Sequence, residues 1–412
     1  MRIRFFNTYE PVSPTYRDLL PFLADQGFEI EVVVSDAEYR QGRTPLEVTL
    51  AHPAIQIRRI KTGLDSVDRG WKKAWVIIRY MMGAMKTSLF GPPVELNFFL
   101  TQPPLFVLWG IFLKTFRGQP YHYLVMDIYP DVAVLDGLLK RKSGITRLLS
   151  TISYLGMKHA DRVVAIGRCM SALIEERGIP QENVITIPNW ANEREVHTVE
   201  KAENKLRAEY GLMDKFVVLY SGNLGVSHYF NDILDVARTL KEYSNLQFVF
   251  VGAGSRLAEI EEAKRKHQLD NVTLLPYQPI ERLAESLSMG DVHFISLRND
   301  FEGIVVPSKA YGAIAAGRPL IYQGNECGEI AQMIHEEHIG AVVPQGDLSG
   351  LQKVIESYVN DPDLAIRDGK KSLLISQTKY SRESALKQFL QLFREFQLRQ
   401  ISEVSQPLQK GK

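Results

Sequence analysis

The chain has 412 residues, of which 45% are hydrophobic and 24% are charged, so it is neither wholly disordered nor too short for two domain cores. Its 49 Lys and Arg residues balance 48 acids, and the net charge of +1 gives no reason to expect nucleic acid as a partner. The two cysteines, Cys169 and Cys327, exclude a disulfide framework and indicate a reducing, cytoplasmic compartment.

Strand-like and helix-like runs alternate along the first half of the chain, a pattern typical of α/β proteins with a parallel sheet covered by helices on both faces. The predicted strands are 2–7, 30–35, 55–60, 94–100, 121–127, 162–166 and 184–187. The predicted helices are 15–26, 71–89, 105–116, 145–159 and 170–177. We therefore expect a Rossmann-like domain over residues 1–190.

Membrane-spanning and secretory segments are not expected. The N-terminal residues run directly into polar sequence, and the longest apolar run, Pro103 to Leu113, is only about half of the roughly 20 residues that a spanning helix needs. Any membrane contact should therefore be peripheral.

Residues 188–204 lose apolar periodicity and are expected to link two domains. The alternating pattern then restarts, with predicted strands at 216–221, 247–251, 272–275, 292–296, 319–323 and 341–343. The predicted helices are 232–243, 256–267, 280–289, 308–316, 326–335 and 348–359. This predicts a second Rossmann-like domain over residues 205–380, followed by a long amphipathic helix over residues 381–403.

Two glycine-containing turns end neighbouring strands of the second domain, at Tyr220–Gly225 and Val251–Ser255. Small residues at such turns let backbone N–H groups approach a phosphate, and ligands of open α/β sheets bind at this edge. By itself the spacing is equally typical of ordinary strand-to-helix turns.

A third segment, Phe301–Tyr322, places Lys309 in the first turn of a predicted helix, directly after Pro307 and Ser308. A lysine opposes the helix dipole at this position, which favours a ligand phosphate between the lysine and the helix N-terminus. The alternative is a solvated lysine beside an N-capping serine.

These motifs, YSGNLG, VGAGSR, VPSKAYGAIAAGRP and the linker sequence IPNWAN, resemble those of the GT4 glycosyltransferases, most closely their WbuB-like and WcaI-like branch. The resemblance extends from Met1 to about Phe396. It implies a GT-B fold, in which the second of two facing Rossmann-like domains holds a nucleotide sugar, the first holds the acceptor, and the terminal helix crosses back to the first domain. Enzymes of this family retain the anomeric configuration.

The resemblance also assigns roles to residues. The family's loop that faces the diphosphate is matched by Gly222, Asn223 and Gly225. The short motif beside that loop is matched by Ser308 and Lys309. Gly252 and the stretch Pro276, Tyr277 and Gln278 match the nucleobase side.

The family pattern has two glutamates at positions that are occupied in this chain by Ile304 and Gly312. We therefore expect Glu302 to reach the sugar instead. His228 stands where the family often has a Lys-Gly pair, and its imidazole can donate to a phosphate.

On the acceptor side, Asp127 ends a predicted strand and resembles the family's acidic residue near the acceptor hydroxyl, where a carboxylate can orient the nucleophile or take its proton. The alternative is a carboxylate that caps the following turn. Asp131 is a weaker candidate for the same role. Ser13 and Thr15 replace a glycine pair of the family and are expected to shape the acceptor side with their hydroxyl groups.

No metal or other cofactor is expected, because the histidines show no metal-ligand spacing and the catalytic segments have no Asp-x-Asp step. Lys309, backbone N–H groups and helix dipoles would meet the charge of the leaving group.

A basic stretch lies between Arg58 and Lys86, where eight Lys and Arg residues accompany two acids and many Trp, Met and Ile residues. Apolar residues on one side of a helix and bases on the other suit the surface of an anionic membrane. The alternative is a core helix with solvated charges.

We therefore expect a retaining hexosyltransferase that moves a sugar from a nucleoside-diphosphate donor, a UDP-sugar, to a lipid or lipid-linked saccharide at the inner face of the cytoplasmic membrane. Two alternatives share the GT-B architecture, namely a UDP-GlcNAc 2-epimerase and a non-catalytic nucleotide-sugar-binding protein. A nicotinamide dehydrogenase is disfavoured, because no G-x-G-x-x-G opens either domain.

Overall fold

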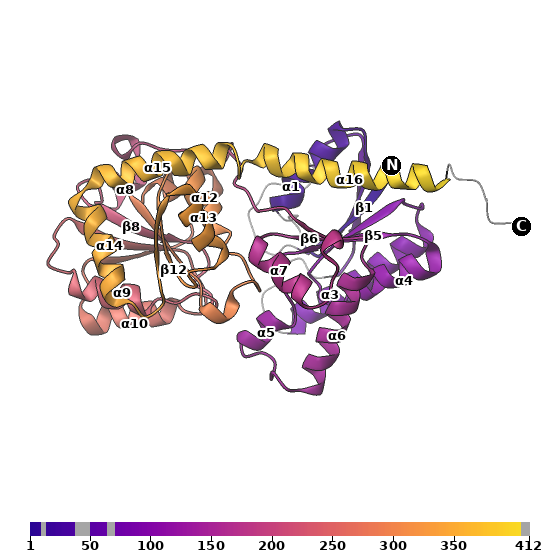
Figure 1. Cartoon of the computed structure of the whole chain (residues 1–412), viewed down its shortest axis with the longest axis horizontal. Coiled ribbons are helices and arrows are strands. Elements are labelled where there is room, and N and C mark those ends of the chain that lie inside the picture. Colours follow the sequence, from indigo (N-terminus) through magenta and orange to yellow (C-terminus); the bar gives the residue numbers. More distant parts are fainter. Residues whose placement is uncertain (10–13, 38–49, 64–70, 405–412) are drawn as a thin grey trace, which may run out of the picture.

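The protein is described from a computed structural model, which defines residues 1–9, 14–37, 50–63 and 71–404. Two α/β domains lie side by side, and two consecutive C-terminal helices run along them, the first along the second domain and the last along the first domain (Figure 1). Both sheets are entirely parallel among the described strands. The predicted fold of two Rossmann-like domains is therefore confirmed.

The first domain is built on a seven-stranded sheet with the order β3-β2-β1-β4-β5-β6-β7. Its strands are β1 (Arg2–Asn7), β2 (Glu29–Ser35), β3 (Ile55–Ile60), β4 (Leu96–Leu100), β5 (Tyr121–Val125), β6 (Arg162–Ala165) and β7 (Val184–Thr186). Each one was predicted, and most of them are the short apolar runs that are typical of strands covered on both faces. The edge strand β3 is an exception, since it holds three polar residues and is only partly buried.

The helices of the first domain pack on both faces of this sheet. They are α1 (Pro14–Asp25), α3 (Trp71–Phe90), α4 (Val107–Arg117), α5 (Asp131–Leu135), α6 (Gly144–His159) and α7 (Arg168–Glu176), with the 3-10 turn η1 (Gln181–Asn183) before β7. Adjacent residues of β1 point to opposite faces. Phe5 contacts Tyr16 of α1 at a centroid distance of 5.2 Å, whereas Phe6 contacts Phe106, next to α4, at 5.2 Å. Aromatic rings thus fill both layers of the core.

The second domain is built on a six-stranded sheet with the order β10-β9-β8-β11-β12-β13. Its strands are β8 (Phe216–Ser221), β9 (Leu246–Val251), β10 (Val272–Leu275), β11 (Val292–Ser296), β12 (Leu320–Gln323) and β13 (Gly340–Val343). Its helices are α8 (Lys205–Glu209), α9 (Asn231–Thr239), α10 (Leu257–His267), α11 (Leu283–Ser288), α12 (Lys309–Ala315), α13 (Glu329–Glu337), α14 (Leu348–Asn360) and α15 (Pro362–Gln377). The 3-10 turns are η2 (Lys201–Glu203), η3 (Ile280–Arg282) and η4 (Asn299–Phe301).

Helix α15 was not predicted from the sequence. It begins at Pro362, which suits the first turn of a helix, but Gly369 interrupts its apolar pattern. A Cβ atom at Gly369 would lie only 2.4 Å from the backbone oxygen of Gly317, so the glycine allows α15 to pack closely against the end of α12. The glycine in α15 is therefore explained by a contact with a segment that is distant in the sequence.

The final helix, α16 (Arg382–Val404), crosses back to the first domain as predicted (Figure 1). Phe393 contacts Phe98 of β4 at 5.6 Å and Phe5 of β1 at 6.0 Å. The C-terminal helix thus completes one face of the N-terminal core.

The linker between the domains is anchored to α1. Trp190 Nε1 donates a hydrogen bond of 2.8 Å to one carboxylate oxygen of Asp18, and Asn192 Nδ2 donates one of 2.9 Å to the other. These two bonds give the IPNWAN motif a structural role. In the described part of the chain, every helix is too short or too polar to cross a bilayer.

Candidate functional site

Two glycine turns meet at the carboxyl ends of β8 and β9. Gly222 and Gly252 have φ angles of +139° and +141°, which favour glycine, and a Cβ atom at Gly252 would lie 2.0 Å from the Gly222 carbonyl oxygen. The Gly222 N–H donates to Val251, and the Gly252 N–H donates to Leu275, each at 2.9 Å. The structure therefore brings both predicted turns together with no room for a side chain between them.

The residues predicted for the nucleobase border this pair of turns. The ring of Tyr277 lies against Gly252, 3.4 Å from the position of a Cβ atom there, and it is partly exposed. Pro276 is exposed, and Gln278 folds back to donate to the Pro276 carbonyl at 3.0 Å. Tyr277 thus borders the glycine turns with part of its surface exposed.

Lys309 approaches the same turns from the start of α12. A Cβ atom at Gly222 would lie 3.2 Å from Lys309 Cε, so a larger residue at Gly222 would press on the lysine. Lys309 Nζ donates to Tyr220 Oη at 2.5 Å and lies 2.7 Å from His228 Nε2. The predicted proximity of the lysine to the glycine turn is therefore present, and Tyr220 is a contact that the sequence analysis missed.

The ring of His228 links Lys309 to the protein interior. Its Nδ1 atom lies 2.6 Å from the Ser296 carbonyl oxygen, which can only accept, so Nδ1 carries the proton and Nε2 is free to accept from Lys309. Burial, reinforced by the charge of Lys309, lowers the pKa of His228 to about 3, and burial also lowers the pKa of Lys309 well below its ordinary value. Both nitrogens of His228 are thus occupied by protein atoms.

The other predicted donor residues lie around this group. Asn223 and Ser308 are exposed, and Gly225 is buried beside the Asn223 side chain. Exposed polar groups therefore border the turn at the end of β8 and the start of α12.

Asp127 contacts the second domain through its backbone. It forms an isolated antiparallel bridge with Val305, and the N–H of Ile128 donates to the Ile304 carbonyl at 2.9 Å. Val305 lies in the loop that leads to Pro307 and α12, so the two domains meet beside the start of that helix. The bridge places Asp127 of one domain against the loop that precedes α12 of the other.

The electrostatic surroundings of Asp127 favour its protonated form more than water does. Burial, with a smaller contribution from the negative charge of Asp136, raises the pKa of Asp127 to about 6. In the part of the chain that the structure describes, no backbone amide donates to this carboxylate, so the capping alternative has no contact to support it. At neutral pH the group is largely ionised and can accept a proton.

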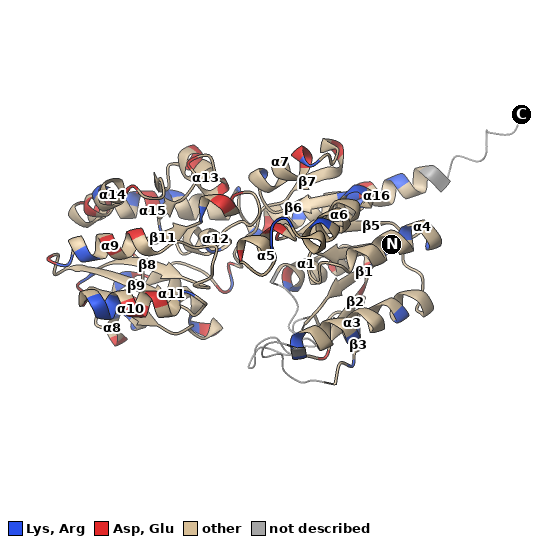
Figure 2. Ribbon diagram, turned by 90° about the horizontal axis from the view of Figure 1, so that it is seen from below, with Lys and Arg blue, Asp and Glu red and all other residues tan. Residues whose placement is uncertain are grey.

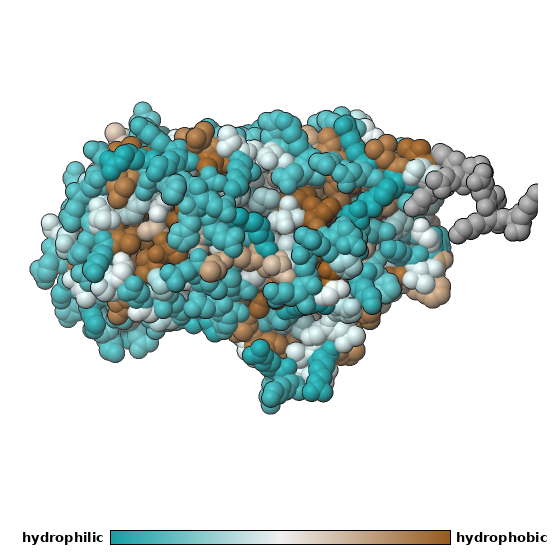
Figure 3. Space-filling view, in the orientation of Figure 1, coloured by the Kyte–Doolittle hydropathy of each residue, from teal (hydrophilic) through white to brown (hydrophobic). Residues whose placement is uncertain are grey.

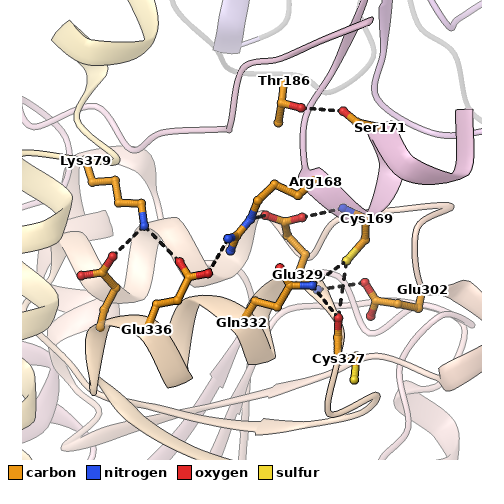
Figure 4. A network of polar contacts seen from close by, with 11 residues as sticks. Arg168, Cys169, Ser171, Thr186, Glu302, Cys327, Glu329, Gln332, Glu336 and Lys379 are labelled. Carbon is orange, nitrogen blue, oxygen red and sulfur yellow. Dashed lines mark hydrogen bonds and ion pairs between the residues drawn. The ribbon is translucent and has the colours of Figure 1, made fainter. Parts of the chain in front are cut away.

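Glu302 has a different environment from the one expected. Its Oε1 accepts from the Glu329 N–H at 3.0 Å and its Oε2 accepts from Tyr322 Oη at 3.2 Å, so it holds the N-terminus of α13 (Figure 4). Burial raises the pKa of Glu302. Both of its carboxylate oxygens are bound to protein groups, which favours a structural role over contact with the sugar.

Glu329 extends this network into the first domain (Figure 4). Its Oε2 accepts from the Cys169 N–H at 3.0 Å, and Arg168 forms ion pairs with both Glu329 and Glu336. The sequence gives no signal for Glu329, because an acid in the first turn of a helix is common. The network therefore joins α7 of the first domain to α13 of the second.

The remaining acceptor-side candidates are placed as follows. Asp131 accepts two hydrogen bonds of 2.9 Å from Arg177, so its carboxylate belongs to an ion pair within the first domain. Thr15 is buried at the start of α1. Ser13 lies outside the described residues.

The two positions where the family has glutamates have apolar surroundings. Ile304 is buried, and a Cβ atom at Gly312 would lie 3.3 Å from Leu287. Among the residues that the structure defines, no three His, Cys, Asp or Glu side chains are grouped as metal ligands would be.

Helix α3 carries much of the predicted basic stretch, while residues 64–70 lie outside the described part. Val76, Tyr80 and Ala84 are buried against the sheet. The expectation that apolar residues and bases occupy opposite sides of this helix is wrong, because the solvent side carries both kinds. Its exposed residues include Trp75, Ile78, Arg79, Met82 and Lys86.

The chain is similar to several known proteins. A profile of the family described as "Glycosyl transferases group 1" matches residues 202–399. WcaI of Escherichia coli, described as a glycosyl transferase of colanic acid biosynthesis, is 30% identical over 332 residues, which cover 77% of this chain and 80% of WcaI. WbjE of Pseudomonas aeruginosa, described as a glycosyltransferase, is 28% identical over 289 residues, which cover 70% of this chain and 72% of WbjE.

Solved structures share the fold at lower identity. HepE of Anabaena, solved with UDP and glucose, has a TM-score of 0.70 at 12% identity, covering 96% of this chain and 100% of HepE. WaaG, a glycosyltransferase involved in lipopolysaccharide biosynthesis, has a TM-score of 0.66 at 14% identity, covering 95% of this chain and 98% of WaaG. At these identities the likeness concerns the fold alone.

Proposed function

The chain belongs to the GT4-type group 1 glycosyltransferases, and on this premise we propose that it transfers a sugar, with retention, from a UDP-linked donor to a lipid or lipid-linked saccharide. The product would be a cell-surface glycan or glycolipid. The observation that carries the proposal is the position of Lys309 against Gly222, at the edge where α/β sheets bind ligands. The UDP bound to HepE and the glycan pathways named for WcaI and WaaG support the choice of donor and product class.

In this proposal the diphosphate of the donor lies between the glycine turns and Lys309. The backbone N–H of Asn223 and the Lys309 side chain, which the negative diphosphate would hold in its ammonium form, would stabilise the negative charge that develops as the bond to the sugar breaks. Tyr277 would stack on the base. We propose that the leaving group is stabilised in this way without a metal ion.

Asp127 would act on the acceptor. The acceptor oxygen forms a bond to the anomeric carbon while the bond from that carbon to the diphosphate oxygen breaks, and the proton of the acceptor hydroxyl passes to the Asp127 carboxylate. A pKa of about 6 leaves this carboxylate ionised at neutral pH, yet basic enough to take the proton.

The exposed side of α3 would bring the protein to the inner face of the cytoplasmic membrane. Trp75 and Met82 offer apolar contacts, and Arg79 and Lys86 offer positive charge on the same side. This arrangement suits the interface of an anionic bilayer, where apolar groups reach the acyl region and bases remain at the phosphates.

A donor panel tests the proposed activity. The protein is incubated with a series of nucleoside-diphosphate sugars, with and without a short-chain lipid-linked acceptor, and the anomeric configuration of the product is read by NMR. Acceptor-dependent release of UDP with retention supports the proposal. An epimerised donor without UDP release identifies an epimerase, and nucleotide-sugar binding without turnover identifies a binding protein.

A further inference from the structure

The exposed large hydrophobic side chains of the first domain are not scattered over its surface. In the described residues before the linker, each of them belongs to α3, to α4 with the turn before it, or to α6 with the segment before it. Examples are Trp75 on α3, Phe116 on α4 and Leu148 on α6, with exposed fractions of 45%, 72% and 60%. Three helices thus share an unusual surface composition.

These three helices cover the same face of the seven-stranded sheet. Phe106 contacts Tyr80 of α3 at 5.8 Å and Phe99 of β4 at 5.4 Å, next to α4. Tyr121, which contacts Phe99 at 5.6 Å, donates a hydrogen bond of 2.6 Å to Gly156 of α6. Helix α16 packs on the opposite face of this sheet, so the exposed apolar residues lie on the side away from it.

Residues 137–148, here called the basic turn, add positive charge to this side. No acid occurs between Asp136 and Asp161. Lys140, Arg141, Lys142 and Arg147 are exposed, and none of them forms an ion pair with a residue that the structure describes. The segment projects from the lower edge of the first domain, and it is blue in the view from below (Figures 1 and 2).

Apolar side chains lie among these bases. Leu138 is 77% exposed and Ile145 is 64% exposed, on either side of Lys140 to Lys142. The tip of the projection is hydrophilic in the space-filling view, with hydrophobic residues directly above it (Figure 3). Apolar side chains that are exposed to water in this way cost free energy, and they are typical of a surface that binds a partner.

The basic turn is held in place by hydrogen bonds. Ser143 Oγ accepts from the Thr146 N–H at 3.1 Å and caps α6, and Thr146 Oγ1 donates to the Lys140 carbonyl at 2.8 Å. Because these bonds fix the turn to the start of α6, Ile145 and the bases are presented together.

We propose that the basic turn is a second membrane contact, which places its bases at the phosphates of an anionic bilayer and its apolar side chains in the acyl region beneath them, while α3 lies on the same surface. Bases interleaved with aliphatic side chains match headgroup phosphates above an acyl layer, whereas nucleic acids offer no apolar layer for Leu138 and Ile145.

This inference deepens the proposed function and rests on its lipid-linked acceptor. Helix α5 begins four residues after Asp127, and the basic turn follows it directly, so a bilayer at the turn lies next to the acceptor side. The turn would therefore deliver the site to an acceptor that does not leave the membrane.

Vesicle sedimentation tests the inference. We expect the wild type to bind vesicles made of equal parts phosphatidylglycerol and phosphatidylcholine, and not vesicles of phosphatidylcholine alone. The combined reversal Lys140→Glu, Arg141→Glu and Lys142→Glu should lower the partition coefficient about a hundredfold, because each base near an anionic surface raises it about fivefold. Ile145→Ser with Leu148→Ser should lower the binding that remains at high salt.

The matched control reverses three exposed bases of the second domain, Lys241, Lys353 and Lys370, and should bind like the wild type. Transfer to a water-soluble acceptor analogue should be unchanged in every variant. Wild-type binding that survives reversal of the basic turn, equal binding to neutral vesicles, or preferential binding of an RNA or DNA probe would overturn the inference. Failure of transfer with every donor would instead overturn the proposed function, and the sedimentation result would still stand.

Discussion

Asp127 of the first domain forms a backbone bridge with Val305 of the second, in the loop that leads to Lys309. The carboxylate proposed to serve the acceptor and the ammonium proposed to serve the donor are thus fixed relative to each other by a contact between domains. Any opening of the domains that breaks this bridge also separates the two groups. Closure of the domains and assembly of the site are therefore one event.

Replacement of Asp127 tests the role of its carboxylate. Asp127→Asn keeps the shape and the backbone bridge but removes the basicity, so kcat should fall by about 10²–10⁴-fold while UDP affinity remains near that of the wild type. Steady-state kinetics and calorimetry measure the two quantities, and thermal unfolding checks the fold. Normal turnover in a folded variant would show that Asp127 takes no proton.

The charge of Asp136 provides a test through pH. Because a nearby negative charge raises the pKa of Asp127, Asp136→Asn should lower that pKa. The proposed base must be ionised, so kcat/KM declines as the pH falls through about 6 in the wild type, and this acid limb should move to lower pH in the variant. If the acid limb did not move, it would report the ionisation of a group other than Asp127.

Lys309 is the residue on which donor binding is expected to depend most. Lys309→Ala removes a charge-assisted contact to the diphosphate, which should weaken UDP binding by about 10- to 150-fold. Lys353→Ala, at an exposed position of α14, is the matched control and should leave the affinity unchanged. Isothermal calorimetry gives both values, and equal affinities in the two variants would contradict the proposed donor site.

His228 is expected to act by holding Lys309. His228→Ala removes the acceptor 2.7 Å from Lys309 Nζ and should weaken UDP binding about three- to tenfold, whereas His228→Gln retains an acceptor and should restore most of it. In a Lys309→Ala background, His228→Ala should have no further effect. A second loss of affinity in that double variant would mean that His228 touches the phosphate itself.

His122 makes a prediction about stability. It belongs to β5 and is buried against Phe393 and Phe396 of α16. Neither ring nitrogen meets hydrogen-bond geometry with a described residue, and burial lowers its pKa to about 3 from the ordinary 6.5. His122→Leu should raise the free energy of unfolding by about 1–3 kcal/mol at neutral pH, because it removes an unsatisfied polar group. Urea unfolding measures this gain, and a loss of stability would show that the ring is satisfied by a group such as a bound water.

The same variant should be less sensitive to acid. Below pH 6.5 the unfolded state binds a proton at His122 that the folded state does not accept until about pH 3, so the folded protein loses stability as the pH falls through this window. The loss has a limit of about 1.4 kcal/mol per pH unit for one histidine. The unfolding free energy of His122→Leu should therefore fall less steeply between pH 6 and pH 4, with urea unfolding at each pH as the measurement.

Most strands were predictable because they are short apolar runs that the helices bury on both faces, whereas the edge strand β3 holds three polar residues and is only partly buried. The proximity of Gly222 to Gly252 followed from the rule that strand ends meet at one edge, and the proximity of Gly222 to Lys309 followed from the family resemblance. The environments of Glu302 and His228 did not follow, because their partners, Tyr322 and Ser296, are distant in the sequence. The mixed surface of α3 also escaped prediction, since residues at one helical spacing can be buried or exposed depending on how far the sheet extends beneath them.

The terminal helix has a consequence for how the chain is synthesised. The aromatic face of the first domain, with Phe5 and Phe98, is covered by Phe393, which leaves the ribosome after almost all of the second domain. Domains usually fold in order of synthesis, but this one cannot close its core until the last helix emerges. The nascent first domain therefore exposes a row of aromatic rings while the second domain is synthesised, and it is completed only when the last helix leaves the ribosome.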